Sequence, residues 1–212
     1  MKKGRRIVMT VTGVLLSGIG CGFIKAAMLG TDPFTAALTG LGGLVGTGYG
    51  NIYAIVNFLL FLAVWRLDQH YIGIATLVNM IGLGYVVQYT ALGVGRVMAR
   101  IAGVWIFPQF LSFALGLVIL CVGSSLYFTA DMGVSTYDAA ALILRDKSRR
   151  SFKACRMGTD LACVAIALFT GASVGFGTVV TAFFMGPVVD FFNKSLAEPL
   201  LYGRIEKQRG IC

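Results

Sequence analysis

The amino-acid sequence predicts an all-α polytopic membrane protein made of two tandem four-helix repeats. Hydrophobic residues make up 57% of its 212 residues and charged residues only 13%, well below the roughly 25% that is usual in soluble domains. Three long stretches carry no charge: residues 7–24, 52–65 and 72–95. Because about 20 apolar residues in a helix span the hydrocarbon core and satisfy their own backbone hydrogen bonds, these stretches predict transmembrane helices.

An internal repeat is the second observation behind this fold class. The sequence aligns with itself at a shift of 103 residues, which becomes 102 after the loss of one residue. The matched positions include Gly30 with Gly133, Asn57 with Asp160, and Gly73 with Gly175. We therefore expect a first membrane repeat over residues 1–100, a second over 101–194, and a cytoplasmic tail over 195–212.

Each repeat is expected to contain a long helix, a short helix and two further helices. In the first repeat the ranges are 7–28, 33–47, 51–66 and 71–94, and in the second they are 104–129, 135–145, 155–171 and 174–193. Both short helices begin at recognisable caps. Asp32 precedes Pro33 at the first start, and Ser135 precedes Asp138 by three residues at the second, which is the spacing of a capping box.

Basic residues beside the apolar segments predict the orientation, because cytoplasmic loops carry an excess of lysine and arginine. Four basic stretches lie near the N-terminus, around Arg96 and Arg100, between Arg145 and Arg156, and from Lys194 onward. We expect all four to be cytoplasmic, which requires each short helix to cross the membrane. This gives about eight membrane segments, repeats in parallel orientation and both termini in the cytoplasm.

The short helices are the main functional clue. A helix of 11–15 residues covers only about 17–22 Å, so its start and the Gly30 or Gly133 loop before it should lie at membrane depth. Irregular backbone is tolerated there inside protein or beside a watery cavity, and paired interrupted segments mark transporter sites. The alternative is close packing of helices at Gly30, Gly133, Gly73 and Gly175, with or without a hinge role.

Few polar side chains lie within the predicted helices, and burial of each in a membrane is costly. The candidate substrate-binding residues are Asp32, Asn57, Asn79, Asp138 and Asp160. Four of them have a structural alternative: Asp32 and Asp138 as helix caps, Asn79 in hydrogen bonds between helices, and Asp160 in an ion pair with Arg156 four residues earlier. Lys25 is expected to snorkel toward the membrane surface.

The motif search argues against several other classes of function. There is no P-loop spacing, no Ser-His-Asp set and no histidine–cysteine cluster in the sequence. We therefore expect no enzyme activity, no resident cofactor and no metal site. The net charge of +9 is attributed to membrane orientation and not to nucleic-acid binding, so the expected partners are the lipid bilayer, a small solute, and a second copy or partner subunit.

Three blocks of sequence resemble the YczE/YyaS/YitT group of bacterial membrane proteins. They are Gly30-Thr-Asp-Pro-Phe-Thr, the stretch from Gly50 to Asn57-Phe-Leu-Leu-Phe, and Tyr71-Ile-Gly-Ile-Ala-Thr-Leu-Val-Asn79. The resemblance implies a multi-pass protein of the bacterial cytoplasmic (inner) membrane. Only about twenty residues follow Phe192, whereas the longer YitT-type members carry a soluble C-terminal domain.

Two hypotheses of function follow. The first is a small-solute membrane transporter or carrier whose site lies between the two repeats. The second is a substrate-binding membrane subunit or accessory factor of a transport ATPase or membrane enzyme, because the chain has no nucleotide-binding motif of its own.

Overall fold

The computed structural model describes residues 3–101, 107–148, 152–172 and 174–202. This part of the chain is helical with short connections and contains no strand. The helices are α1 (Lys3–Ala26), α2 (Pro33–Val45), α3 (Tyr49–Leu67), η1 (Gln69–Tyr71), α4 (Ile74–Val78), η2 (Asn79–Leu83), α5 (Gly84–Ile101), α6 (Phe107–Ala130), α7 (Thr136–Ser148), α8 (Phe152–Phe169), α9 (Phe176–Phe192), η3 (Asn193–Ala197) and α10 (Glu198–Tyr202). The all-α class is confirmed, and a helix lies at each of the eight predicted ranges.

Five helices in the described ranges are long and apolar enough to cross a membrane. They are Lys3–Ala26, Tyr49–Leu67, Ile74–Arg100, Phe107–Ala130 and Phe176–Leu201. The last continues past residue 194, where we expected the second repeat to end, and it buries Leu201. Residues 203–212 of the predicted tail lie outside the described residues. The chain is therefore a membrane protein with several apolar helices.

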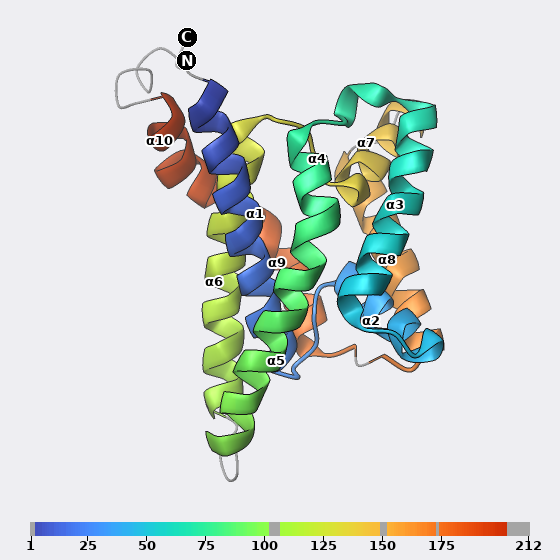
Figure 1. Ribbon diagram of the computed structural model, residues 1–212, viewed down its shortest axis with the longest axis vertical. Helices are drawn as coiled ribbons and strands as arrows, with labels where there is room; N and C mark the ends of the chain where they lie inside the picture. Colours follow the sequence, from blue (N-terminus) through green and yellow to red (C-terminus); the bar gives the residue numbers. More distant parts are fainter. Residues whose placement is uncertain (1–2, 102–106, 149–151, 173, 203–212) are drawn as a thin grey trace.

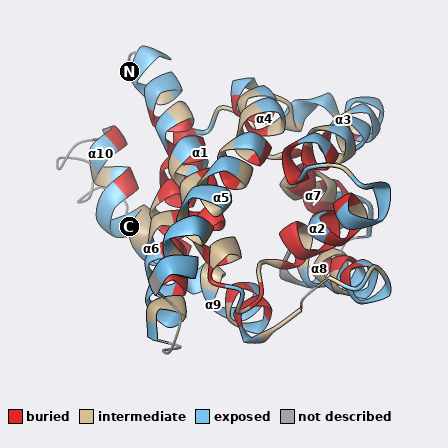
Figure 2. Ribbon diagram, turned by 60° about the horizontal axis from the view of Figure 1, so that its bottom comes forward, coloured by how far each residue is buried: buried red, intermediate tan, exposed pale blue. Residues whose placement is uncertain are grey.

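The helices form two groups that lie side by side (Figures 1 and 2). The first group contains α1, α4–α5, α6 and α9–α10, and its central contact is between α1 and α6. The second contains α2, α3, α7 and α8, in which α2 packs mainly on α8, and α7 contacts both α3 and α8. Each group thus combines helices from both halves of the sequence, so neither half forms a bundle alone.

The two long helices α1 and α6 approach closely because glycines remove side chains from their interface. A Cβ atom on Gly13 would lie 2.7 Å from the carbonyl oxygen of Gly123, and one on Gly116 would lie 2.8 Å from that of Gly20. The early glycine of one helix therefore meets the late glycine of the other, and the helices run antiparallel. We predicted parallel repeats, in which α1 and α6 would point the same way; the structure corrects that orientation.

The short helices do not cross from one end of the molecule to the other. Here the upper end is where α1 begins and α6 ends, and the lower end is where α1 ends and α6 begins (Figure 1). Helix α2 ends at the lower end and α7 ends at the upper end, so each returns to the end from which the chain entered. The predicted crossing by each short helix is wrong, because 13 residues extend only about 20 Å.

This arrangement also changes the assignment of the basic stretches. The start of α1, the end of α7 and the end of α10 lie at the upper end, whereas α5 ends at the lower end (Figure 1). Arg100 is in the last turn of α5. The expectation that all four basic stretches share one side therefore fails for Arg96 and Arg100, and Arg149, Arg150 and the basic residues after 203 lie outside the described residues.

Candidate functional site

The N-terminal ends of α2 and α7 meet near the middle of the molecule, between the two helix groups. The ring of Phe34 stacks on the ring of Tyr137, with centroids 4.4 Å apart and planes inclined by 17°. From this contact α2 runs to the lower end and α7 to the upper end (Figure 1). Two half-length helices thus direct the positive ends of their dipoles toward one place.

Asp32 forms the start of α2, as the sequence predicted. Its Oδ2 accepts a hydrogen bond from the backbone N–H of Thr35 at 3.0 Å, and Pro33 occupies the first turn. Its other oxygen, Oδ1, accepts from the thiol of Cys21 on α1 at 3.2 Å. The capping carboxylate therefore also joins the two helix groups.

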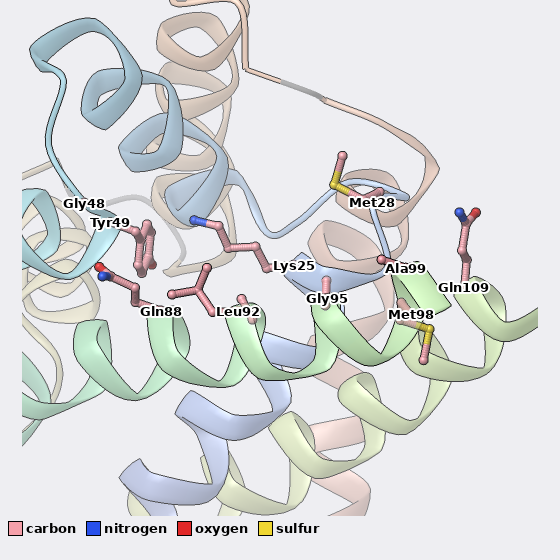
Figure 3. Close-up of a pocket in the computed structure, with 12 residues that line it drawn as sticks. Lys25, Met28, Gly48, Tyr49, Gln88, Leu92, Gly95, Met98, Ala99 and Gln109 are labelled. Atoms are coloured by element: carbon pink, nitrogen blue, oxygen red, sulfur yellow. The ribbon is translucent and has the colours of Figure 1, made fainter. Parts of the chain in front are cut away.

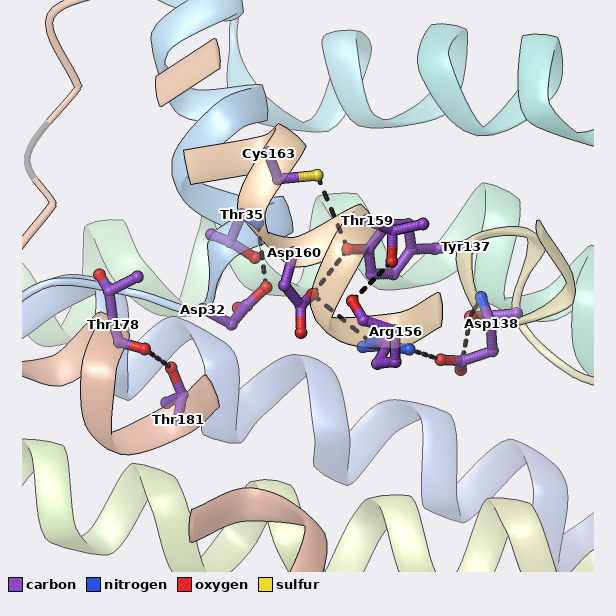
Figure 4. Close-up of polar contacts among 11 residues, drawn as sticks. Asp32, Thr35, Tyr137, Asp138, Arg156, Thr159, Asp160, Cys163, Thr178 and Thr181 are labelled. Atoms are coloured by element: carbon purple, nitrogen blue, oxygen red, sulfur yellow. Dashed lines mark hydrogen bonds and ion pairs between the residues drawn. The ribbon is translucent and has the colours of Figure 1, made fainter. Parts of the chain in front are cut away.

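A second charged cluster lies at the start of α7 and in the first half of α8 (Figure 4). Arg156 pairs with Asp138 and, at 3.5 Å, with Oδ1 of Asp160. The hydroxyl of Tyr137 donates to the same Asp160 oxygen at 2.6 Å. Ser135 caps α7, because its Oγ accepts a hydrogen bond from the Asp138 N–H at 3.1 Å, and the same hydroxyl donates to Asp138 Oδ2 at 2.7 Å.

The predicted ion pair between Arg156 and Asp160 is present, but it is only part of the cluster. The Arg156 side chain retains 32% of its exposure, against 13% for Asp138 and 17% for Asp160. The three charges pair with one another between packed helices, which offsets part of the cost of placing charges in a membrane. The sequence did not link Asp138 to Arg156, which is 18 residues away on another helix.

Asn57 and Asn79 lie in a separate, neutral network. The hydroxyl of Tyr53 donates to Asn79 Oδ1 at 2.6 Å, and Asn57 donates to the carbonyl oxygen of Tyr53 at 2.8 Å. Asn57 also accepts a hydrogen bond from the hydroxyl of Thr136 on α7. These asparagines are buried, and they connect α3 to η2 and α7.

The four candidate glycines lie at two contacts between the halves. At the lower end, the N–H of Gly177 on α9 donates to the carbonyl oxygen of Leu29 at 2.7 Å. At the upper end, the N–H of Ala75 on α4 donates to the carbonyl oxygen of Met132 at 3.0 Å.

Glycine is needed on both sides of these contacts. Gly30 and Gly133 in the loops have φ values of +102° and +98°, a region that favours glycine. Gly175 and Gly73 begin the two helices and leave space for the loops, since a Cβ on Gly175 would lie 2.5 Å from Leu29 O.

An open cavity of about 620 Å³ lies at the lower end, between the ends of α1 and α5 and the starts of α3 and α6. Lys25 lines this cavity and also a smaller one of about 80 Å³ beside Gly30 and Thr31. Its Nζ donates to Thr39 Oγ1 at 2.9 Å and lies 3.7 Å from the centroid of the Tyr49 ring. Lys25 thus points inward (Figure 3), and the expected snorkelling is wrong.

A polar contact at the upper end fastens α7 to the connection between α3 and α4. Asp146 accepts hydrogen bonds from the hydroxyl of Tyr71 at 2.7 Å and from Arg145 Nε at 2.8 Å. These bonds lower the pKa of Asp146, and the bond to Asp146 raises the pKa of Tyr71. The contact is solvent-exposed, and we assign it a tethering role.

Comparison with known proteins places the chain in a family. A family model described as a family of unknown function, DUF6198, matches residues 4–194. The chain belongs to this family. No solved structure matches it.

Three curated relatives have similar lengths and low identity. The chain is 24% identical to the uncharacterized protein YyaS of Bacillus subtilis, covering 85% of this chain and 88% of the relative. It is 22% identical to the uncharacterized membrane protein YczE of the same organism, covering 84% and 81%, and 23% identical to an uncharacterized protein of Haemophilus influenzae, covering 91% and 85%. The resemblance to YczE and YyaS is confirmed.

Proposed function

We propose that the chain is a membrane carrier for a small solute, with its central site where the N-terminal ends of α2 and α7 meet. The observation that carries this proposal is the head-to-head arrangement of two half-length helices, marked by the stacked rings of Phe34 and Tyr137. Interrupted helices that direct their N-termini toward the middle of a membrane are a recurring feature of secondary transporters. The neighbouring charged side chains of Asp32, Asp138, Arg156 and Asp160 supply polar groups for a solute.

We further propose that the two halves are inverted repeats related by an axis in the membrane plane. The antiparallel course of α1 and α6 supports this relationship. The two loop contacts support it as well, because Leu29 and Met132 are 103 residues apart and their partners Gly177 and Ala75 are 102 apart. Positive φ values also occur in pairs, at Met28 (59°) and Asp131 (51°), and at Gly30 and Gly133.

In this arrangement six segments cross the membrane and two re-enter it. The crossing segments are α1, α3, α4–α5, α6, α8 and α9–α10, while α2 and α7 enter and leave on the same side. Among the described residues, the upper end then carries most of the basic side chains, including Arg5, Arg6, Arg145 and Lys147, against Lys25, Arg96 and Arg100 at the lower end. By the positive-inside rule the upper end and both termini are cytoplasmic, in the inner membrane of a bacterium.

Uptake into proteoliposomes tests the carrier function directly. The purified chain would be reconstituted alone and offered radiolabelled organic anions, organic cations and sugars. We expect uptake of one class, lowered about tenfold or more by Asp160→Asn because that change weakens the cluster around Arg156. Asp146→Asn is the matched control, since Asp146 is also a paired aspartate but lies exposed at the upper end.

Two outcomes contradict parts of this proposal. If Asp160→Asn transports as well as the unaltered chain, Asp160 is not part of the site. If the chain binds a solute without moving it, the alternative role as a substrate-binding subunit of a transport ATPase or membrane enzyme replaces the carrier role.

A further inference from the structure

The cavity at the lower end has an unusual distribution of charge. Lys25 is the ionised side chain among the residues that line it, and neither this cavity nor the smaller adjoining one is lined by aspartate or glutamate. Within the described residues, no carboxylate lies within ion-pair distance of Lys25, whose Nζ contacts the Thr39 hydroxyl and the Tyr49 ring. The cavity therefore presents a positive charge that the protein does not neutralise by direct pairing.

Two amide side chains on the cavity wall can donate hydrogen bonds to an anion. The backbone N–H of Gly50 donates to Gln88 Oε1 at 2.6 Å, which leaves the amide nitrogen of Gln88 as a donor at the wall. Gln109 contributes a second amide from the start of α6. The rest of the wall is largely apolar and includes Met28, Leu92 and Met98 (Figure 3).

We propose that this cavity binds a soluble organic anion, with its carboxylate or phosphate at Lys25 and its apolar body against the methionines and Leu92. A volume of about 620 Å³ lies within the range of small-molecule sites. A partly desolvated ammonium over an aromatic ring attracts an anion more strongly than an ammonium in water does. Binding of an anion at this cavity does not depend on the proposed carrier function. Only the further step, that the bound anion is the transported solute, rests on that function.

The position of Lys25 links this cavity to the centre of the molecule. The adjoining 80 Å³ cavity lies between Lys25 and the Gly30–Thr31 backbone that leads into α2. Asp32 follows this backbone, and its carboxylate already occupies the N-terminal end of α2, so an anion is bound at Lys25 and not at that helix end. Lys25 would therefore be the first binding position for an anion that enters from the lower end.

A binding measurement separates this proposal from others. Benzoate and benzylamine have the same ring and opposite charges. Saturation-transfer NMR is sensitive to weak binding, so it can test each compound separately against the full chain in phosphatidylcholine nanodiscs. We expect benzoate to bind and benzylamine not to bind. Lys25→Gln should weaken benzoate binding about tenfold or more while Lys25→Arg retains it, because the positive charge supplies the affinity.

Arg100→Gln is the matched control, because it removes a positive charge from the same end without altering the cavity wall. Equal binding of benzoate and benzylamine, or benzoate binding to Lys25→Gln at the unaltered level, would falsify the proposal. Displacement of benzoate when phosphatidylglycerol replaces part of the phosphatidylcholine would also overturn it, by assigning Lys25 to a lipid headgroup. Uptake of a different solute without benzoate binding would refute the anion site and leave the carrier function standing.

Discussion

The upper and lower ends of the molecule contain the same kind of loop contact, but they differ in how tightly the helices pack beside it. At each end, a glycine loop from one half docks on the first turn of a helix from the other half. At the upper end, η3 and α10 then pack on α1 and α6, with Ala197 at 0% and Leu201 at 2% exposure. At the lower end, Gly95 and Ala99, which the 102-residue shift pairs with Ala197 and Leu201, border the open cavity.

The difference indicates which parts of the fold are constant and which can vary. The loop contacts use backbone atoms and glycine on both sides, so little space remains for rearrangement. The closure beside them uses side-chain packing around Leu201 and a hydrogen bond between Thr129 and Asn193 of 3.2 Å. A carrier with inverted repeats can exchange the open and closed arrangements between its ends, and this closure is the part that would change.

The largest expected effect comes from breaking the shared contact with Gly73→Ala. A Cβ at this position would overlap the carbonyl oxygen of Met132 and lie 2.9 Å from the Cα of Gly133. Because both obstacles are backbone atoms, the loop must move, and we expect a loss of about 3 kcal/mol or more in the free energy of unfolding. Gly175→Ala should behave similarly at the lower end, where Leu29 O is the obstacle.

Thermal unfolding of purified variants in detergent measures this effect, with yield from the membrane as a second reading. Gly93→Ala is the control, because no atom lies within 4 Å of a Cβ there and alanine favours a helix by about 1 kcal/mol over glycine. A Gly73→Ala protein as stable as Gly93→Ala would show that the contact with Met132 is looser than described.

Much of the fold could be predicted from the sequence because helix length, capping and apolar character are local properties. The start of α2 at Pro33, capped by Asp32, is an example. The direction of α6 relative to α1 could not be predicted in this way. The prediction of parallel repeats depended on placing Arg96 and Arg100 on the same side as the other basic stretches. Two arginines are weak evidence for this, because the positive-inside rule describes only a statistical bias among loops.

The candidate site was predicted less completely because its contacts are tertiary. The importance of Asp160 and the pair it forms with Arg156 followed from a spacing of four residues in one helix. The contact between Arg156 and Asp138 joins two helices, and no periodicity indicates it. Lys25 was misassigned for the same reason, since its inward direction depends on Thr39 and Tyr49 of α2 and α3.

A smaller effect is expected when the upper closure alone is weakened by Leu201→Ala. Leu201 packs with Met9, Leu126 and Ala130, and removal of a buried leucine side chain costs about 2–4 kcal/mol where the space does not refill. Leu200→Ala removes the same atoms from a side chain that is 44% exposed and should change the unfolding temperature little. Equal effects of the two substitutions would show that α10 does not seal the upper end.

The smallest effect is expected from Arg6→Gln, which removes the ion pair beside this closure. Arg6 Nη1 lies 3.9 Å from Asp131 Oδ2, and the Asp131 side chain is 84% exposed. Water screens such a pair, so its loss should change the free energy of unfolding by less than about 0.5 kcal/mol. A double-mutant cycle with Asp131→Asn isolates the interaction, and Arg5→Gln controls for the loss of charge at the same terminus. A coupling energy above about 1 kcal/mol would mean that charge pairing, and not the packing of Leu201, holds the upper end closed.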